Sequence, residues 1–243
     1  MQRWLIIGAG GLGCAAGRAL AKAAPCLPPL ELTVVDDDTV AATNLHRQAF
    51  YNQDDVGSLK AEIFARRFAE MASRAGATVR VHPRIERVGP SNVRDLFREH
   101  DLVLEGSDNF ATKFLCADAA YLENVRVVHA GVVRWAGYAL ASGAGRGCYR
   151  CIFEEMPDGV VDTCAEAGVV GPLVGVVGAL QARLLTRVAL GEQSASIVQV
   201  DALRGGAIRP RALRPRPSCA LCSDAPTIQS IDPARYAMTC ALA

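Results

Sequence analysis

The chain has 243 residues, 51% of them apolar, which is enough for one α/β domain with a well-buried core. Its 26 basic and 25 acidic residues give a formal net charge of +1 and form no basic run, which argues against a nucleic-acid partner. No apolar run reaches the roughly 18 residues needed to cross a membrane.

The first 130 residues alternate between strand and helix signals. Apolar runs typical of strands lie at residues 3–8, 30–36, 101–108 and 125–131, and residues 78–85 alternate as in a half-buried strand. Apolar residues recur at helical spacing over 12–24, 59–76 and 112–124. This order predicts an α/β fold with a doubly wound, mostly parallel sheet and helices on both faces.

The pattern changes after Gly131. Residues 135–142, 194–201 and 207–213 are expected to form the strands of an antiparallel extension, and residues 169–182 a buried, glycine-rich helix. The tail over 214–226 is proline-rich and irregular. We therefore expect a single domain over 1–243, with its core over 1–130 and the extension and tail over 131–243.

A glycine turn, GAGGLG, follows the first strand and opens the first helix. Gly8, Gly10 and Gly13 have the spacing that permits a tight turn, and the free N–H groups of the helix start attract phosphate. Asp36, at the end of the second strand, suits a ribose hydroxyl. Both NAD and ATP carry these groups, so the two features leave both ligands open.

Charges further along the chain favour ATP. A triphosphate concentrates more negative charge than a diphosphate, so it calls for extra cations such as Arg47 and Lys60 and an acid such as Asp108 to hold Mg²⁺. Taken singly, Arg47 and Lys60 would be ordinary surface charges. Their combination with the glycine turn is more specific.

In this order, GAGGLG, DxDxVxxxNLxRQ, GxxK and SDNxxT resemble the ThiF/MoeB/HesA superfamily, the prokaryotic relatives of ubiquitin-activating enzymes. The stretches GCYRCIF and CALCSDAPTIQSID are similar to the same family. The resemblance implies a Rossmann-like sheet that binds Mg²⁺ and ATP. It also implies that the enzyme adenylates the carboxy-terminal glycine of a small, ubiquitin-like β-grasp carrier protein that ends in Gly-Gly.

The resemblance also assigns residue roles. Asn44, Arg47 and Lys60 would bind the phosphates, and Asp38 and Asp108 would lie near Mg²⁺ and the reacting α-phosphate. Arg47, Lys60 and Asp108 are the expected catalytic residues at this site. The expected nucleotide-binding set is Gly8, Gly10, Gly11, Gly13, Asp36, Asp38, Asn44, Arg47, Gln48, Lys60, Asp108 and Asn109.

Two C-x-x-C pairs lie far apart in the sequence: Cys148 with Cys151, and Cys219 with Cys222. Four thiolates in two chelating pairs match the closed, tetrahedral geometry of structural zinc. The alternative is four core or disulfide cysteines. The odd total of nine cysteines favours a cytoplasmic protein, and disulfides are disfavoured in the cytoplasm. Zinc would clip the tail to the edge of the domain.

The remaining cysteines divide into two groups. Cys14 and Cys116 lie within helix patterns and are expected in the core. Cys164 lies in the polar loop VDTCAEAG, and the resemblance implies sulfur or thioester transfer at this position. An inert loop thiol is the alternative. The four histidines show no catalytic or metal-binding grouping.

The sequence also departs from the family. Its relatives usually carry a helical segment before the first strand, and an arginine of that segment reaches the neighbouring subunit's ATP. The sequence begins at that strand, so Arg18, Arg134 or a partner protein would have to compensate, and we expect a homodimer or a partner complex. Lys113 stands where an arginine is common. The rival hypotheses are an enzyme activating another carboxylate (a peptide or a tRNA base), a partner-dependent subunit, and an NAD oxidoreductase.

Overall fold

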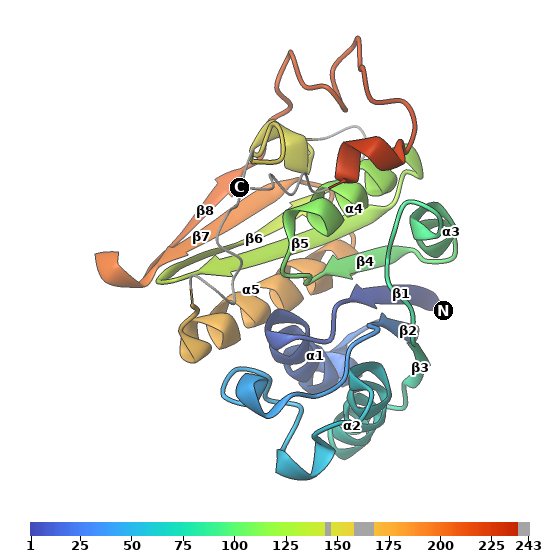
Figure 1. The fold of residues 1–243 in the computed structure, drawn as a ribbon, viewed down its shortest axis with the longest axis vertical. Helices are drawn as coiled ribbons and strands as arrows, with labels where there is room; N and C mark the ends of the chain where they lie inside the picture. The colour runs from blue at the N-terminus through green and yellow to red at the C-terminus, as the bar shows by residue number, and fades with distance from the viewer. Residues whose placement is uncertain (144–146, 158–167, 238–243) are drawn as a thin grey trace, which may run out of the picture.

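The computed structural model describes residues 1–143, 147–157 and 168–237. Eight strands form one sheet in the order β3-β2-β1-β4-β5-β6-β7-β8 (Figure 1). The strands are β1 Gln2–Ile7, β2 Leu30–Val35, β3 Arg80–Arg84, β4 Leu102–Glu105, β5 Arg126–Val133, β6 Ala136–Ser142, β7 Ser196–Asp201 and β8 Ala207–Ala212. The first five are parallel and the last three antiparallel, which confirms the expected parallel sheet with an antiparallel extension.

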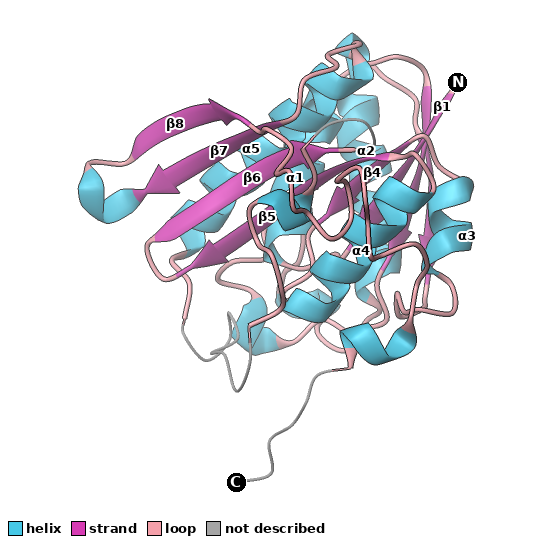
Figure 2. Cartoon of the chain, turned by 90° about the horizontal axis from the view of Figure 1, so that it is seen from above, coloured by secondary structure: helices cyan, strands magenta, loops and turns pink. Residues whose placement is uncertain are grey.

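Helices cover both faces of the sheet (Figures 1 and 2). They are α1 Gly11–Ala23, α2 Lys60–Arg74, α3 Val93–Arg98, α4 Phe110–Leu122 and α5 Gly171–Ala189. Along β1, Trp4 and Ile6 pack against α1, α2 and α5, while Leu5 and Ile7 pack against α3 and α4. This alternation is the two-residue period of a strand buried on both sides. The sequence analysis missed α3, whose six residues are too short to show a clear period.

The strand order places a crevice at the carboxyl end of the parallel strands. β1 pairs with β2 on one side and with β4 on the other, so the chain connections run in opposite directions from β1. Doubly wound sheets bind ligands outside the carboxyl ends of their strands at such a switch point. The glycine turn after β1 and the loops after β2 and β4 therefore meet at one place.

The long helix α5 is an internal part of the fold. By length and composition it could cross a membrane, but it packs against α1, β5 and β6. A Cβ atom on Gly178 would come within 2.5 Å of the Ala15 side chain, so this glycine allows α5 and α1 to approach closely. Val177 and Leu185 are fully buried beside it. The expected buried, glycine-rich helix is confirmed.

Candidate active site

One pocket lies at the switch point and gathers residues from distant parts of the sequence. Of the twelve expected nucleotide-binding residues, Gly13 alone does not line it. The other eleven are Gly8, Gly10, Gly11, Asp36, Asp38, Asn44, Arg47, Gln48, Lys60, Asp108 and Asn109. The structure therefore brings together glycines, cations and carboxylates from the three connections that follow β1, β2 and β4.

The glycine turn is shaped by backbone contacts. Gly8 has a φ of +88°, a left-handed conformation that favours glycine. A Cβ atom on Gly13 would lie 1.9 Å from the carbonyl oxygen of Gly8, so Gly13 permits the helix to start directly against the strand. This explains why Gly13 matters although it lies beneath the pocket.

Asp36 joins the glycine turn to the loop after β2. Its Oδ2 accepts the backbone N–H of Ala9 at 2.7 Å, and its Oδ1 accepts that of Asp38 at 2.9 Å. Burial raises the pKa of this carboxyl above its usual value, although both hydrogen bonds oppose the shift. Asp36 thus stabilises the turn from inside and also lines the pocket.

Lys60 and Asp38 form an ion pair in the pocket wall. The Lys60 Nζ lies 2.7 Å from Asp38 Oδ2, and the Lys60 side chain is 6% exposed whereas that of Asp38 is 67% exposed. Lys60 begins α2, and its backbone N–H donates to the Asp38 carbonyl at 3.0 Å. The sequence analysis expected the two residues near the phosphates but did not predict that they pair with each other.

A short turn presents Asn44, Arg47 and Gln48. The backbone N–H groups of Arg47 and Gln48 both donate to the Asn44 carbonyl at 3.1 Å. Gln48 is almost completely buried, and its Oε1 has no hydrogen-bond partner among the described residues. An unpaired buried acceptor in a pocket wall is a position where a bound ligand could supply a donor.

The loop after β4 carries Asp108, which is exposed, and Asn109. Asn109 Oδ1 accepts the backbone N–H of Thr112 at 2.8 Å and so caps α4. Asn109 therefore has a local structural role in addition to its place in the pocket wall. Asp108 therefore places an exposed carboxylate at the pocket from the loop after β4, while Asp38 and Lys60 line the pocket from the connection between β2 and α2.

Beneath this loop lies a buried charged group that the sequence analysis missed. Glu105 ends β4, and its Oε2 accepts hydrogen bonds from Lys113 Nζ at 3.0 Å and His129 Nδ1 at 3.1 Å. From the sequence, Lys113 is only a departure from the usual arginine, and His129 is one of four histidines with no catalytic or metal-binding grouping. The one available signal was a glutamate at the end of an otherwise apolar strand.

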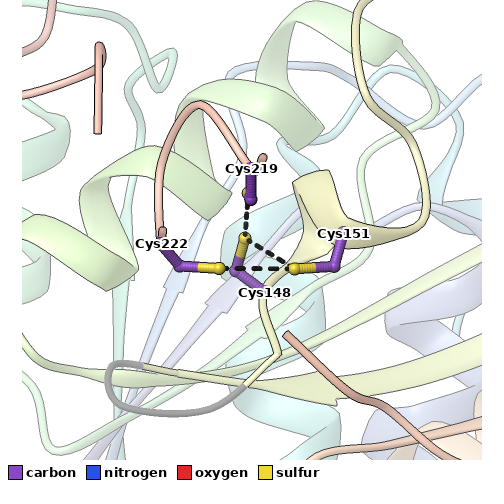
Figure 3. A group of neighbouring side chains, drawn as sticks. All are labelled: Cys148, Cys151, Cys219 and Cys222. Carbon is purple, nitrogen blue, oxygen red and sulfur yellow. Dashed lines mark hydrogen bonds between the residues drawn. The ribbon is translucent and has the colours of Figure 1, made fainter. Parts of the chain in front are cut away.

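The four cysteines of the two C-x-x-C pairs converge, with their sulfur atoms directed toward one another (Figure 3). Their sulfur atoms all lie within 4.8 Å of one another, with 3.5 Å between Cys148 and Cys219 and 3.3 Å between Cys151 and Cys222. Sulfur atoms at the corners of a tetrahedron around Zn²⁺ would be about 3.8 Å apart, given a Zn–S distance of about 2.3 Å. The donor set and its spacing therefore fit zinc.

The other predicted residues are placed as follows. Cys14 and Cys116 are fully buried, as expected for core residues, and burial raises the pKa of both thiols. Arg18 donates to the Ala49 carbonyl at 2.8 Å, and neither Arg18 nor Arg134 is among the described residues that line the pocket. Cys164 lies outside the described residues.

Comparison with known proteins agrees with this architecture. Residues 1–221 match the ThiF family. The chain is 35% identical to the SAMP-activating enzyme E1 of Haloferax volcanii, over 99% of this chain and 87% of that one. It is also 35% identical to the sulfur carrier protein adenylyltransferase of Thermus thermophilus, over 92% of this chain and 83% of that one.

Two further similarities have a narrower meaning. The adenylyltransferase and sulfurtransferase MOCS3 of Sus scrofa is 36% identical over 93% of this chain, which spans about half of that protein (49%). A crystal structure of E. coli MccB with MccA-N7isoASN has a TM-score of 0.74 at 19% identity, covering 92% of this chain and 67% of that one. The second similarity supports the fold alone.

Fold and pocket together define a nucleotide-binding α/β enzyme built on a Rossmann-like sheet. The chain belongs to the ThiF family. It is an adenylyltransferase.

Proposed function

We propose that the enzyme joins AMP to the carboxy-terminal glycine of a small ubiquitin-like or sulfur-carrier protein ending in Gly-Gly, and releases pyrophosphate from ATP. The observation that carries this proposal is the convergence of eleven expected nucleotide-binding residues on one pocket, in a chain whose relatives are named as carrier-protein adenylyltransferases. A carrier carboxylate oxygen would attack the α-phosphorus of ATP. The bond to the β-phosphate oxygen would break, and pyrophosphate would leave with its electron pair.

The proposed residue roles follow from charge and position. The glycine turn and the start of α1 would bind phosphate through backbone N–H groups. Arg47 and Lys60 would offset the negative charge of the triphosphate and the attacking carboxylate. Asp36 would accept a hydrogen bond from the ribose, while Asp108 with Asp38 would hold Mg²⁺ through oxygen ligands. When bound, Mg²⁺ would neutralise phosphate charge.

Exchange of labelled pyrophosphate into ATP tests the proposal. Exchange should require Mg²⁺ and a carrier with a free terminal glycine carboxylate, and a carrier lacking its last glycine should support none. The truncated carrier is the matched control because it keeps the β-grasp fold and loses only the nucleophile. Exchange supported by a different carboxylate, such as that of a short peptide, and not by any carrier would contradict the proposed substrate class.

We propose a second step at Cys164, in which its thiolate attacks the carrier adenylate and AMP leaves. Adenylation needs no protein nucleophile, so Cys164→Ala should retain exchange and lose any thiol-sensitive covalent carrier adduct. The adduct is measured by electrophoresis with and without reducing agent. An adduct that persists in Cys164→Ala would assign the role to another cysteine or to none.

We also propose that the enzyme works as a homodimer or with a partner protein. Val133 and Trp135 at the β5–β6 turn and Val176 on α5 are each more than 40% exposed. They are near pocket residues Val132 and Val174 in the sequence, and apolar exposure of this kind is typical of an interface. Light scattering at low micromolar concentration tests this, and a monomer with full exchange activity would contradict it.

A further inference from the structure

The pocket loop between β4 and α4 is held at both ends by buried groups. It comprises residues 106–109, including Asp108, and it lies between Glu105, the last residue of β4, and Lys113, in the first turn of α4. Neither the Glu105 nor the Lys113 side chain is more than 7% exposed. The residues on either side of this loop are therefore joined by a buried ion pair.

The Glu105 carboxylate binds the loop directly. Its Oε1 accepts the backbone N–H of Ser107 at 2.7 Å and also the Ser107 hydroxyl. Its Oε2 accepts hydrogen bonds from Lys113 and His129. Burial alone would raise the pKa of Glu105, but the charge of Lys113 and these hydrogen bonds lower the pKa to about 2. The carboxyl group is therefore charged at neutral pH.

Lys113 connects the same carboxylate to two other elements. Its Nζ lies 3.0 Å from Glu105 Oε2 and also donates to the Ala130 carbonyl of β5. Asn109 caps the same helix end through Thr112. One ammonium group thus fixes the positions of β4, β5 and the start of α4 relative to one another.

A fourth element, α5, contributes through Gln181. Its Nε2 donates to the Glu105 carbonyl at 2.7 Å and to the Val128 carbonyl at 2.9 Å, so it bridges the last residue of β4 and the neighbouring strand β5. Gln181 and His129 are both completely buried. Side chains from three elements besides β4 therefore converge on the residue that precedes the loop.

Stability alone does not explain this arrangement. The desolvation of a buried ion pair offsets much of its attraction, and well-packed apolar residues are often at least as stabilising. We propose that Glu105 and Lys113 are positioning residues that hold loop 106–109 so that Asp108 stays aimed at the nucleotide during adenylation. This inference rests on the proposed function.

A direct role for Lys113 is the competing explanation, because Lys113 also lines the pocket. An ammonium that bound phosphate would act through its charge on ATP, and its loss would raise the KM for ATP. In the structure this charge is paired with Glu105. A positioning role instead predicts a lower kcat with little change in the KM for ATP.

The test combines Lys113→Met with Asp108→Asn in pyrophosphate exchange. Lys113→Met should lower kcat by about 30-fold or more. Losses are not additive for residues that act as a unit, so the double variant should be no slower than Asp108→Asn alone. The KM for ATP should change by less than about threefold. Additive losses, or a loss confined to the KM for ATP, would overturn the proposal.

Rescue by a length-matched pair provides a second readout. Glu105→Asp shortens the acid by one methylene, while Lys113→Arg lengthens the base, so the double variant restores the span that each single variant disrupts. We expect the double variant to exchange faster than either single variant. A double variant slower than both would contradict the pairing.

Folding is monitored by thermal unfolding of each variant. If Lys113→Met does not fold, Ser107→Ala replaces it in the same cycle with Asp108→Asn, because it removes one hydrogen bond to Glu105 and leaves the buried ion pair intact. Absence of exchange in the unmodified enzyme would count against the proposed function. If the unmodified enzyme catalyses exchange and neither Lys113→Met nor Ser107→Ala changes its rate, only the positioning role is overturned.

Discussion

Replacing Asp108 by alanine is expected to lower the rate of carrier-dependent pyrophosphate exchange by at least about 100-fold, the scale of one lost group that stabilises developing charge. The substitution removes the exposed carboxylate on the pocket rim, where Mg²⁺ and the α-phosphate are proposed to bind. The backbone of this loop is held by Glu105 and by the cap of α4. The fold should therefore persist while the chemistry is lost.

The measurement is exchange at saturating ATP, with thermal unfolding as the check on folding. Asp54→Ala is the matched control because Asp54 is an exposed aspartate that does not line the pocket. The control should exchange at the unmodified rate. Unchanged exchange in Asp108→Ala would reject the assignment of this site, whatever the state of the other pocket residues.

Loss of the cysteine cluster is expected to have the largest effect on stability. We propose that Cys148, Cys151, Cys219 and Cys222 bind one Zn²⁺. Metal binding of this kind contributes directly to folding. Cys219→Ser should reduce zinc from one equivalent to near zero. It should also lower the Tm by roughly 10 °C or more, since 1 kcal/mol shifts the Tm by about 2–4 °C in a chain of this size.

The two cysteine pairs should respond differently. The first is anchored to α4 because Arg150, between Cys148 and Cys151, donates to both carboxylate oxygens of Asp118 at 2.7 and 2.9 Å. The second lies in the tail and meets the first through its sulfur atoms (Figure 3). Cys219→Ser should therefore release the tail first, which limited trypsin cleavage after Arg235 would detect.

Cys26→Ser is the matched control, because Cys26 is an exposed cysteine outside the cluster. It should retain zinc and the unmodified Tm. Metal analysis is made on protein purified without added zinc. A metal-free sample with the same Tm and the same resistance to trypsin would contradict the zinc assignment.

The sequence by itself determined the architecture and eleven of the residues that line the pocket. Hydrophobic periods of two and of about 3.6 residues predict strands and helices directly, because each follows from local backbone geometry. The glycine turn could be identified because its glycines meet a steric requirement of neighbouring backbone, as at Gly8 and Gly13. The two C-x-x-C pairs could be matched because chelation restricts residue type and spacing.

The tertiary structure decided which polar groups pair with one another. Lys60 and Asp38 are 22 residues apart, and Glu105 meets Lys113, His129 and Gln181 from three other elements. Hydrogen bonds and ion pairs act over a few ångströms. Only the packing of β4 beside β5, with α4 on one face and α5 on the other, brings the partners of Glu105 within that range. A single glutamate at the end of a strand gives the same sequence pattern whether its side chain is solvated or buried among cations. Its partners can therefore be identified only in the folded chain.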